Sequence, residues 1–501
     1  MPRTCHAAVD LGAGSGRVLV GTIDDHGVRL EEAHRFAYAP RRTAGHLRWD
    51  MTSLLSGLRE GLQCAHVTAS TWNARLESVG VDAWGVDYGL IDGDGRLLED
   101  PICYRDERTQ GVMERACGLV SRDALFHATG IQLLPFNTVF QLMAHVEKGL
   151  PAGAERLLLM PDLCHHALCG SSSTEHTNAS TTQLLNVDTA TWDVDILSRL
   201  CLPSALLPPL RPAGTRLGEL HAEWQRDLEL PPLDVIQPGT HDTASAVAGT
   251  PLEPGWAFVS SGTWSLVGVE RRAPLINADV LAENVANERG VDGTFRFLKN
   301  VMGLWILESC RREWLNAGER AGLSDLLDGA ARLRQCPGFV YPDDPRFFNP
   351  PHMVDELKAA LTESGQEPPA DPVSLTRIVL DSLALRYATI IETLERLTGD
   401  PIAGVHVVGG GSRNDYLNQA TANATARPVL AGPVEATSLG NALMQSVACG
   451  KTTVQGGRML IRAAHPPRLF EPEGTAEWQD AKGRYRRLET DALRRLTSAR
   501  T

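Results

Sequence analysis

AAVDLGAGSGRVLVGT, residues 7–22, is the stretch of this sequence that decides its fold. Two short apolar runs flank a turn of glycine and serine, a pattern that is typical of a β-hairpin. A second stretch of the same design, WAFVSSGTWSLVGVE, occupies residues 256–270. Because the two stretches lie about half a chain apart, we interpret them as copies of a duplicated domain rather than as repeats of a solenoid.

Further strands and helices are expected after each hairpin. Residues 76–87 predict a buried strand that ends in a polar turn, and residues 404–408 predict a strand that runs into three glycines. An apolar stripe after Ser374, the expected N-cap, predicts a long helix that stops at Gly399. Strands that alternate with helices indicate α/β layers in both halves, with a boundary near residues 239–254. The charged last thirty or so residues predict a surface helix.

Composition excludes several classes of protein. The chain has 501 residues and a formal net charge of −13. Such an acidic chain is not expected to bind nucleic acid or an anionic membrane through its net charge. It has no apolar stretch of about 18 residues and no apolar core near its start, so we expect neither a membrane-spanning helix nor a secretory signal.

The 10 cysteines are scattered, which favours reduced thiols in a cytoplasmic protein over a disulfide framework. One cluster, Cys164-His165-His166 with Cys169, suggests a metal site. A zinc site would need a second pair of ligands at a suitable spacing, and none follows. We interpret the cluster as part of a helix that buries small thiols.

Three glycine motifs suggest phosphate binding. Gly12-x-Gly14-x-Gly16 resembles a dinucleotide fingerprint, but that fingerprint needs a following helix and a strand follows here. Gly450-Lys451-Thr452 resembles the end of a P-loop, but Gln445 stands where that motif needs glycine. The third motif, residues 409–411, follows a strand and leaves backbone amides free to approach a nucleotide.

Hairpin turns rich in glycine and serine can also hold phosphates, because their consecutive N–H groups form a concave anion site. Two such hairpins, one from each domain, would clamp a triphosphate between them. Asp10, at the end of the first strand, would then lie near the metal and the phosphates. Each loop by itself is equally consistent with an ordinary tight turn.

The sequence resembles the FGGY carbohydrate kinases of the actin-like ATPase superfamily. The resemblance rests on the Asp10-Leu11-Gly12 hairpin, on its echo at residues 260–263, on residues 409–411, and on GTHDTASA at 239–246 and YRDERT at 104–109. Within that family the motif set is similar to that of the kinases of L-rhamnulose. The additional markers are VDAWGVDY (81–88), LPFNT (134–138), MPD (160–162), HDTASAV (241–247), SSGTWS (260–265), LKNVMGLW (298–305) and GPVEA (432–436).

The resemblance implies an α/β fold of two actin-like (ribonuclease H-like) domains with a cleft between them. Residues 1–245 would hold the phosphate loop and the sugar, residues 246–460 would bind the nucleotide, and residues 461–501 would form a helical extension. The implied activity is Mg²⁺- and ATP-dependent phosphorylation of L-rhamnulose at its 1-hydroxyl, in L-rhamnose breakdown. The implied partners are the sugar and ATP, without nucleic acid or membrane, for a monomer or homodimer.

The resemblance also implies the site residues. Glu308 stands where the family often has Gln, and its charge would repel phosphate unless it faces ribose or solvent. The implied positions are Asp242 as the catalytic base, Ala13, Gly14, Ser15, Gly16, Arg17, Thr263, Glu308 and Gly410 for ATP, Gly85, His241, Asp242, Thr243 and Asn300 for the sugar, and Asp10 for the metal.

Each role has a plainer alternative. Asp242 could accept a proton from a hydroxyl or only cap a helix, and Asp10 could hold Mg²⁺ or only end a strand. Arg17 could contact phosphate or be a surface charge at a strand edge. Trp84 could wall a sugar pocket or belong to the core. For His241, a hydrogen bond to a hydroxyl is favoured over metal binding, since no second ligand lies at a suitable spacing.

Rival functions remain at this stage. A non-enzymatic actin-like ATP-binding module would share the hairpins but lack the Trp84-Gly85 and 241–243 segments. Another FGGY kinase would share both. The strand after Gly16 disfavours a dinucleotide oxidoreductase, and the absence of a Gly-x-Ser-x-Gly elbow disfavours a hydrolase.

Overall fold

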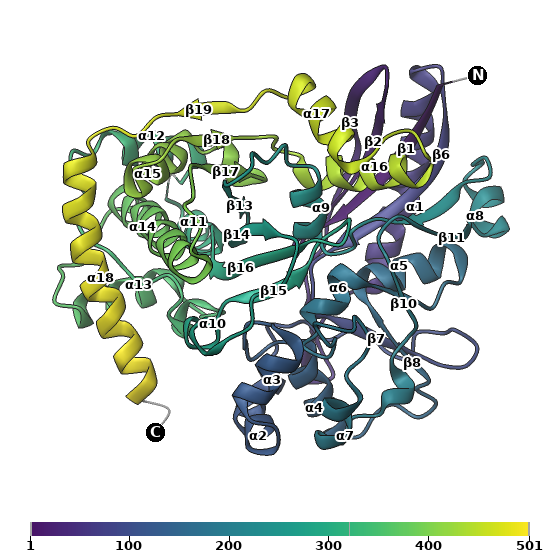
Figure 1. The fold of residues 1–501 in the computed structure, drawn as a ribbon, viewed down its shortest axis with the longest axis horizontal. Helices are drawn as coiled ribbons and strands as arrows, with labels where there is room; N and C mark the ends of the chain where they lie inside the picture. Colours follow the sequence, from purple (N-terminus) through teal and green to yellow (C-terminus); the bar gives the residue numbers. More distant parts are fainter. Residues whose placement is uncertain (1–2, 320, 499–501) are drawn as a thin grey trace. The chain divides into compact units, whose positions relative to one another are not determined.

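The computed structural model describes residues 3–319 and 321–498. By their contacts these residues form two compact units. Of the described residues, unit 1 comprises 3–251, 270–297 and 435–466, and unit 2 comprises 252–269, 298–319, 321–434 and 467–498. Each unit contains a sheet with helices packed on it (Figure 1).

The sheet of unit 1 is built outward from the first hairpin. Strands β1 and β2 pair antiparallel, as the sequence predicts, and β2 pairs antiparallel with β3. On its other side β1 pairs parallel with β6, which pairs parallel with β12. The strand order is β11 (Thr215–Glu219), β12 (Asp234–Gln237), β6 (Ala74–Ala83), β1 (Arg3–Leu11), β2 (Ser15–Asp24), β3 (Gly27–Ala37).

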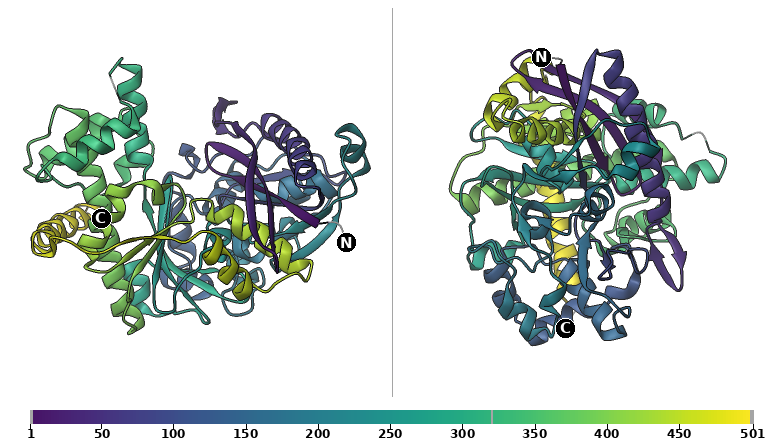
Figure 2. Two further views of the ribbon diagram at one scale, coloured as in Figure 1. Left: turned by 90° about the horizontal axis from the view of Figure 1, so that it is seen from above. Right: turned by 90° about the vertical axis from the view of Figure 1, so that its right-hand side faces the viewer.

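Helices α1 (Met51–Thr71) and α16 (Ala436–Ala448) pack on opposite faces of this sheet. Gly61 of α1 lies against Val18, whereas Ala442 of α16 packs with Ala8, which pairs with the residue after Val18. Successive side chains of a strand point to opposite faces, so the two helices cover different faces. Figure 2 shows α16 and α17 (Val454–Ala464), in yellow, beside the purple strands from the other end of the chain.

The remaining elements of unit 1 are mostly short. Helix α9 begins at Asp242, where the sequence predicts a helix, and α5 buries Cys164 as expected. The helices are α2 (Val112–Leu119), α3 (Arg122–Thr129), α4 (Thr138–Lys148), α5 (Met160–Cys169), α6 (His176–Thr181), α7 (Val194–Arg199), α8 (Ala222–Asp227), α9 (Asp242–Ala248) and α10 (Ala278–Glu283). The strands are β4 (Arg41–Thr43), β5 (His46–Arg48), β7 (Tyr88–Ile91), β8 (Arg156–Leu159), β9 (Thr174–Glu175), β10 (Leu210–Arg211) and β15 (Ala286–Arg289).

The sheet of unit 2 repeats this design. Strands β13 (Ala257–Ser261) and β14 (Trp264–Arg271) form the second predicted hairpin, and β13 pairs parallel with β17 (Val405–Val408). Strand β17 pairs parallel with β18 (Val429–Ala431), to which β19 (Arg468–Phe470) adds antiparallel. Within unit 2 the strand order is β16 (Phe295–Met302, from residue 298 on), β14 (up to residue 269), β13, β17, β18, β19.

Helix α14 (Pro372–Thr398) is the long helix that the apolar stripe predicts, and it ends at Gly399 as expected. Its N-cap is Asp371 rather than Ser374, because the Asp371 carboxylate accepts the Ser374 N–H and the helix starts with Pro372. Proline is favoured at the first position of a helix, because the N–H groups of the first turn have no partner within the helix. The helix therefore begins earlier than the apolar stripe indicates. The other helices of unit 2 are α11 (Trp305–Asn316), α12 (Leu323–Arg332), α13 (Met353–Glu363), α15 (Asp415–Thr425) and α18 (Thr475–Ser498).

The two α/β units confirm the predicted fold class. In each, a hairpin supplies the first strands, and the next strands pair parallel with the first strand of that hairpin. Helix α18 covers much of the predicted charged C-terminal segment. Among residues 3–319 and 321–498, no helix is long and apolar enough to cross a membrane.

Candidate active site

Asp10 is the penultimate residue of β1 and is buried next to the hairpin turn. The turn itself is short, because the Gly12 N–H donates to the Ser15 carbonyl at 2.9 Å. Ala13 and Gly14 lie in this turn, and Gly14 is exposed. The predicted phosphate loop is therefore an open turn with a buried carboxylate at its base.

Arg17 of β2 lies directly opposite Asp10 in the hairpin. Its guanidinium donates to the Asp10 carboxylate and to the carboxylate of Glu435, which precedes α16. The side chain is 21% exposed, so Arg17 is an internal cation and not a strand-edge surface charge. Its two carboxylate partners compensate the charge of this arginine within the chain.

Asp82 joins Asp10 from the neighbouring strand β6, where the two residues are paired in register. It is fully buried, and its Oδ2 accepts a hydrogen bond from Asn441 of α16 at 2.6 Å, whereas its Oδ1 has no hydrogen-bond partner in the structure. Burial raises the pKa of the Asp82 carboxyl well above its usual value, and Asp10 raises it further. Sequence reasoning gave Asp82 no role, although a shared Val-Asp before each turn, at residues 9–10 and 81–82, was a signal for it.

Asp242 begins helix α9. Its Oδ1 accepts hydrogen bonds from the Thr243 N–H at 2.6 Å and the Thr243 hydroxyl at 3.2 Å, and lies 3.4 Å from His241 Nε2. Within the described chain, no hydrogen bond reaches Oδ2, and the side chain is 31% exposed. Partial burial raises the pKa of this carboxyl, His241 opposes the rise and Asp10 adds to it. A carboxylate with one open oxygen and a raised pKa is suited to accept a proton.

The segment before Asp242 is held by buried hydrogen bonds. The Glu175 carboxylate accepts the N–H of Thr240 at 2.9 Å, and Thr177 Oγ1 accepts the N–H of His241 at 3.2 Å. Behind it, α9 touches α16 backbone to backbone, since a Cβ on Gly440 would lie 1.8 Å from the Ser245 carbonyl oxygen. The start of α9 is therefore fixed on both sides.

The predicted sugar residue Gly85 lies in a tight turn after β6. A Cβ there would lie 2.9 Å from Thr181 Oγ1, so only glycine leaves room for Thr181. The next residue, Val86, has φ +70°, which is strained for a β-branched residue. Its carbonyl accepts from the Thr138 hydroxyl at 2.8 Å and from Gln141 at 3.2 Å, which hold the turn in place.

Trp84 is buried in the structure. Its ring lies 4.5 Å from that of Trp49, and both indole N–H groups donate to Asp87 Oδ2, at 3.0 and 2.7 Å. Gln141 donates to Asp87 Oδ1 at 3.1 Å. Burial raises the pKa of Asp87 to about 6 even though these donors favour its charged form. Trp84 therefore belongs to a packed layer under the turn, as the plainer interpretation has it.

In unit 2 the second hairpin and the glycine loop lie side by side. A Cβ on Gly411 would lie 2.0 Å from Ser261 Oγ, and one on Gly409, whose φ is +80°, would lie 3.0 Å from the Ser261 carbonyl oxygen. A Cβ on Gly410 would meet nothing, so this residue faces open space. Thr263 is exposed at the tip of the hairpin. Both predicted nucleotide contacts of this region are thus accessible.

The remaining predicted residues of unit 2 lie on β16 and α11. Asn300 is half-buried on β16. Glu308, in the first turn of α11, receives two hydrogen bonds from Arg311, at 2.8 and 2.9 Å. The pair is close to neutral, so the repulsion of phosphate expected of an isolated Glu308 is reduced.

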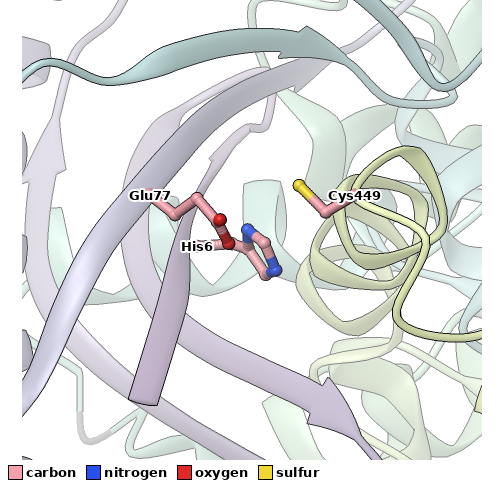
Figure 3. A group of neighbouring side chains, drawn as sticks. All are labelled: His6, Glu77 and Cys449. Atoms are coloured by element: carbon pink, nitrogen blue, oxygen red, sulfur yellow. The ribbon is translucent and has the colours of Figure 1, made fainter. Parts of the chain in front are cut away.

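Two clusters of residues that often bind metals make contacts within the chain instead. In the cluster at 164–169, His165 Nε2 accepts the Val81 N–H and His166 contacts the Gly95 carbonyl. A second cluster, His6, Glu77 and Cys449, lies near the start of β1 and is shown in Figure 3. The Lys451 ammonium pairs with Glu77 and lies 3.4 Å from His6 Nε2. Lys451 therefore supplies the positive charge at this cluster.

Asp10, Asp82 and Asp242 in unit 1 are of the residue type that binds a hard divalent cation, but among the described residues they do not form a group of three ligands within coordination distance of one another. Asp10 raises the pKa of both Asp82 and Asp242, and one buried oxygen of Asp82 has no hydrogen-bond partner. Mg²⁺ prefers carboxylate, phosphate and water oxygens, which such carboxylates and a nucleotide would supply. Asp242 is therefore suited to accept a proton, and Asp10 and Asp82, which are paired in register, offer the type of ligand that a metal–phosphate group needs.

Comparison with known proteins identifies similar sequences along most of the chain. Residues 6–249 match the N-terminal domain, and residues 257–449 the C-terminal domain, of the FGGY family of carbohydrate kinases. The rhamnulokinase of Bacillus subtilis is 38% identical over 470 residues, covering 93% of this chain and 95% of the relative. That of Enterococcus faecalis is 41% identical over 471 residues, covering 93% and 94%.

Solved structures are similar in fold at low sequence identity. A gluconate kinase from Lactobacillus acidophilus has a TM-score of 0.79 at 14% identity, covering 97% of this chain and 98% of its own. A glycerol kinase from Plasmodium falciparum, solved with ADP, has a TM-score of 0.77 at 14% identity, covering 98% of each chain. At this level of identity the likeness concerns the fold alone.

Proposed function

The chain belongs to the FGGY family of carbohydrate kinases, and we propose that it transfers the γ-phosphoryl group of ATP to the 1-hydroxyl of L-rhamnulose. The product would be L-rhamnulose 1-phosphate, an intermediate of L-rhamnose breakdown. The proposal is supported by rhamnulokinases at 38% and 41% identity over nearly their full length. The observation in the site that carries it is the Asp242 carboxylate, with one oxygen held by the chain and the other open.

Asp242 Oδ2 would act as the general base. As the 1-hydroxyl oxygen of the sugar bonds to the γ-phosphorus, its proton passes to Oδ2 and the bond from the γ-phosphorus to the bridging oxygen of ADP breaks. The raised pKa of Asp242 favours this transfer, because a stronger base takes the proton more readily. Thr243 holds Oδ1, so the orientation of the carboxylate is set before the sugar binds.

The sugar would be contacted by Gly85, His241, Asp242 and Thr243 of unit 1 and by Asn300 of unit 2. Support comes from the fixed segment at residues 240–243 and from the tight turn at Gly85. ATP would be bound by Ala13, Gly14, Ser15, Gly16 and Arg17 of unit 1 and by Thr263, Glu308 and Gly410 of unit 2. The open turn at Gly14 and the open space at Gly410 support these assignments.

Asp10 would hold Mg²⁺, with Asp82 beside it as an additional oxygen donor. When bound, the ion neutralises charge that develops on the phosphates. The Arg17 guanidinium, held by Asp10 and Glu435, would donate its remaining N–H groups to the same phosphates.

Three further proposals concern the whole protein. Free thiols at all 10 cysteines favour a reducing compartment, and we place the enzyme in the cytoplasm. We propose a monomer or homodimer. We also keep the sequence ranges 1–245, 246–460 and 461–501 as the proposed functional divisions, beside the contact-based units.

A coupled assay of ADP release tests the activity. L-rhamnulose, L-fuculose, D-xylulose and glycerol are compared at equal concentrations with Mg²⁺ and ATP, and L-rhamnulose is expected to give the highest kcat/KM. Asp242→Asn is the matched control, since it should remove the activity towards each sugar. If another ketose is the best substrate, the assignment of the sugar is wrong; if no sugar increases ADP release, the proposed activity is wrong.

A further inference from the structure

A buried ion pair lies behind His241 in unit 1. It joins Glu288 of β15 to Arg296 of β16, with 3.0 Å between Glu288 Oε2 and Arg296 Nη2. The Arg296 side chain is 0% exposed and the Glu288 side chain 5%. Charged groups are rarely buried this deeply, and keeping them there costs free energy unless the pair is well compensated. Neither residue has a role in the proposed function so far.

The hydrogen bonds of Arg296 determine where the His241 proton lies. A guanidinium has only donors, so every partner of Arg296 must accept. Its Nη2 makes hydrogen bonds with the Arg289 carbonyl at 3.0 Å and with His241 Nδ1 at 3.1 Å, and Glu288 Oε2 lies 3.0 Å from the same nitrogen as its ion-pair partner. In the hydrogen bond with this donor, His241 Nδ1 is the acceptor. In a neutral imidazole the proton is then on Nε2.

The protonated nitrogen faces the proposed reaction centre. His241 Nε2 lies 3.4 Å from Asp242 Oδ1, and the backbone N–H of His241 is fixed by Thr177. Glu288 Oε2 lies 3.3 Å from Nδ1 and supplies the negative charge that compensates the buried guanidinium. The pair thus keeps a donor, and not an acceptor, pointing towards Asp242 and the space beside it.

We infer that Arg296 and Glu288 are positioning residues that hold His241 as the Nε2–H tautomer, so that Nε2 donates a hydrogen bond to a sugar oxygen next to the hydroxyl that Asp242 deprotonates. This inference rests on the proposed function for its sugar, but its statement about the tautomer does not. The other tautomer would place a lone pair where a sugar hydroxyl acceptor needs a donor.

The test compares Arg296→Met with Arg296→Lys, which keeps a charged donor. In Arg296→Met we expect KM for L-rhamnulose to rise about tenfold, as for loss of one oriented hydrogen bond, with KM for ATP unchanged. Arg296→Lys should recover part of that loss. Because a lone buried Glu288 carboxylate could prevent folding, the double variant Arg296→Met/Glu288→Gln is made as well. It should show the same rise in KM for L-rhamnulose, with KM for ATP unchanged.

Arg386→Met is the matched control for loss of a buried arginine. Arg386 is also buried and pairs with Asp343 at 2.7 Å and with Glu489, but it lies on α14 of unit 2. We expect this variant to lower Tm without changing either KM. If Arg296→Met and the double variant lower Tm but leave KM for L-rhamnulose within about twofold of the wild-type value, the pair is only structural and the inference is wrong.

A second readout is independent of the substrate. In protein labelled with ¹⁵N-histidine, the ring nitrogens of His241 are assigned by comparison with His241→Asn. Their chemical shifts should show an unprotonated Nδ1 and a protonated Nε2, and in the double variant this preference should be lost. A protonated Nδ1 in the wild-type protein would overturn the inference. If the tautomer is as stated but no sugar is phosphorylated, the proposed function fails instead.

Discussion

The two hairpins, β1–β2 of unit 1 and β13–β14 of unit 2, have the same topology and different chemistry. Each is antiparallel, each closes with a short glycine turn, and the first strand of each pairs parallel with a later strand. The positions just before the last strand pair are Asp10 in β1 and Ser260 in β13. Their parallel neighbours are Asp82 and Val408.

Charge is therefore concentrated in one copy of the design. In unit 1, Asp10, Asp82, Asp242 and Arg17 affect one another electrostatically. In unit 2, hydroxyls and glycine backbone lie at the corresponding turn. In the function we propose, one copy of the scaffold supplies acidic and basic side chains for phosphoryl transfer, and the other supplies neutral donors for the nucleotide.

Among the variants that test this comparison, Asp242→Asn should cause the largest loss of turnover. An amide cannot accept the hydroxyl proton, so we expect turnover to fall by roughly a hundredfold or more, whereas ATP binding persists. ADP release with L-rhamnulose measures the first, and isothermal titration with ATP measures the second. Near-normal turnover would mean that the base has been assigned to the wrong residue.

Asp10→Asn and Ser260→Ala test the hairpins at corresponding positions. Loss of the Asp10 charge should lower kcat at least about tenfold and raise the Mg²⁺ concentration needed for half-maximal rate. Ser260→Ala removes no charge and should leave both values within about twofold. Equal losses in the two variants would contradict the division of charge between the units.

Gly16→Ala and Gly262→Ala compare the packing of the two turns. A Cβ at Gly16 would lie 2.3 Å from the ring of Phe36, whereas one at Gly262 would lie 3.7 Å from the Trp264 carbonyl oxygen. Overpacking typically costs about 1–3 kcal/mol, so Gly16→Ala should lower Tm by several degrees and Gly262→Ala should change it little. Differential scanning calorimetry measures both, and a larger drop for Gly262→Ala would refute the packing argument.

Asp87→Asn should have the smallest effect on activity, and its informative readout is the pH dependence of stability. Because the amide would meet the donors of Trp49, Trp84 and Gln141, we also expect a lowering of Tm that does not itself depend on pH. The folded pKa of Asp87 is raised from 3.8 to about 6 by burial, so its contribution to stability is present below about pH 4 and is lost as the pH rises through 6. The variant lacks this titration. The Tm of the variant minus the Tm of the wild type should therefore increase between about pH 4 and about pH 7. A difference in Tm that does not change with pH would contradict the raised pKa of Asp87.

Much of the fold could be predicted from the sequence because its signals are local. Both hairpins, the strand at β17 and the long helix α14 follow from apolar runs, glycine turns and helix periodicity. The start of α14 was predicted three residues too late, at Ser374, because Asp371 caps it before the apolar stripe begins. Motifs around Asp10 and Asp242 were also visible, since each combines an acid with a strand or helix boundary.

Residues that act from a distance in sequence were not predicted. Glu435 reaches Arg17, and Arg296 reaches His241, from elements far along the chain. No local pattern marks these contacts, because charged residues in strands and loops are usually solvated. Asp82 was not predicted either, although its Val-Asp motif repeats that of Asp10 and was a local signal for it.

The sequence by itself determined the duplicated α/β design and the family of carbohydrate kinases, because turns, periodicity and ordered motifs depend on neighbouring residues. Only the tertiary structure decided that Arg17 is an internal cation, that Asp82 lies beside Asp10, and that Arg296 orients His241. These relations depend on strand register and burial, which set distances and the free-energy cost of each charge through packing that no short stretch encodes.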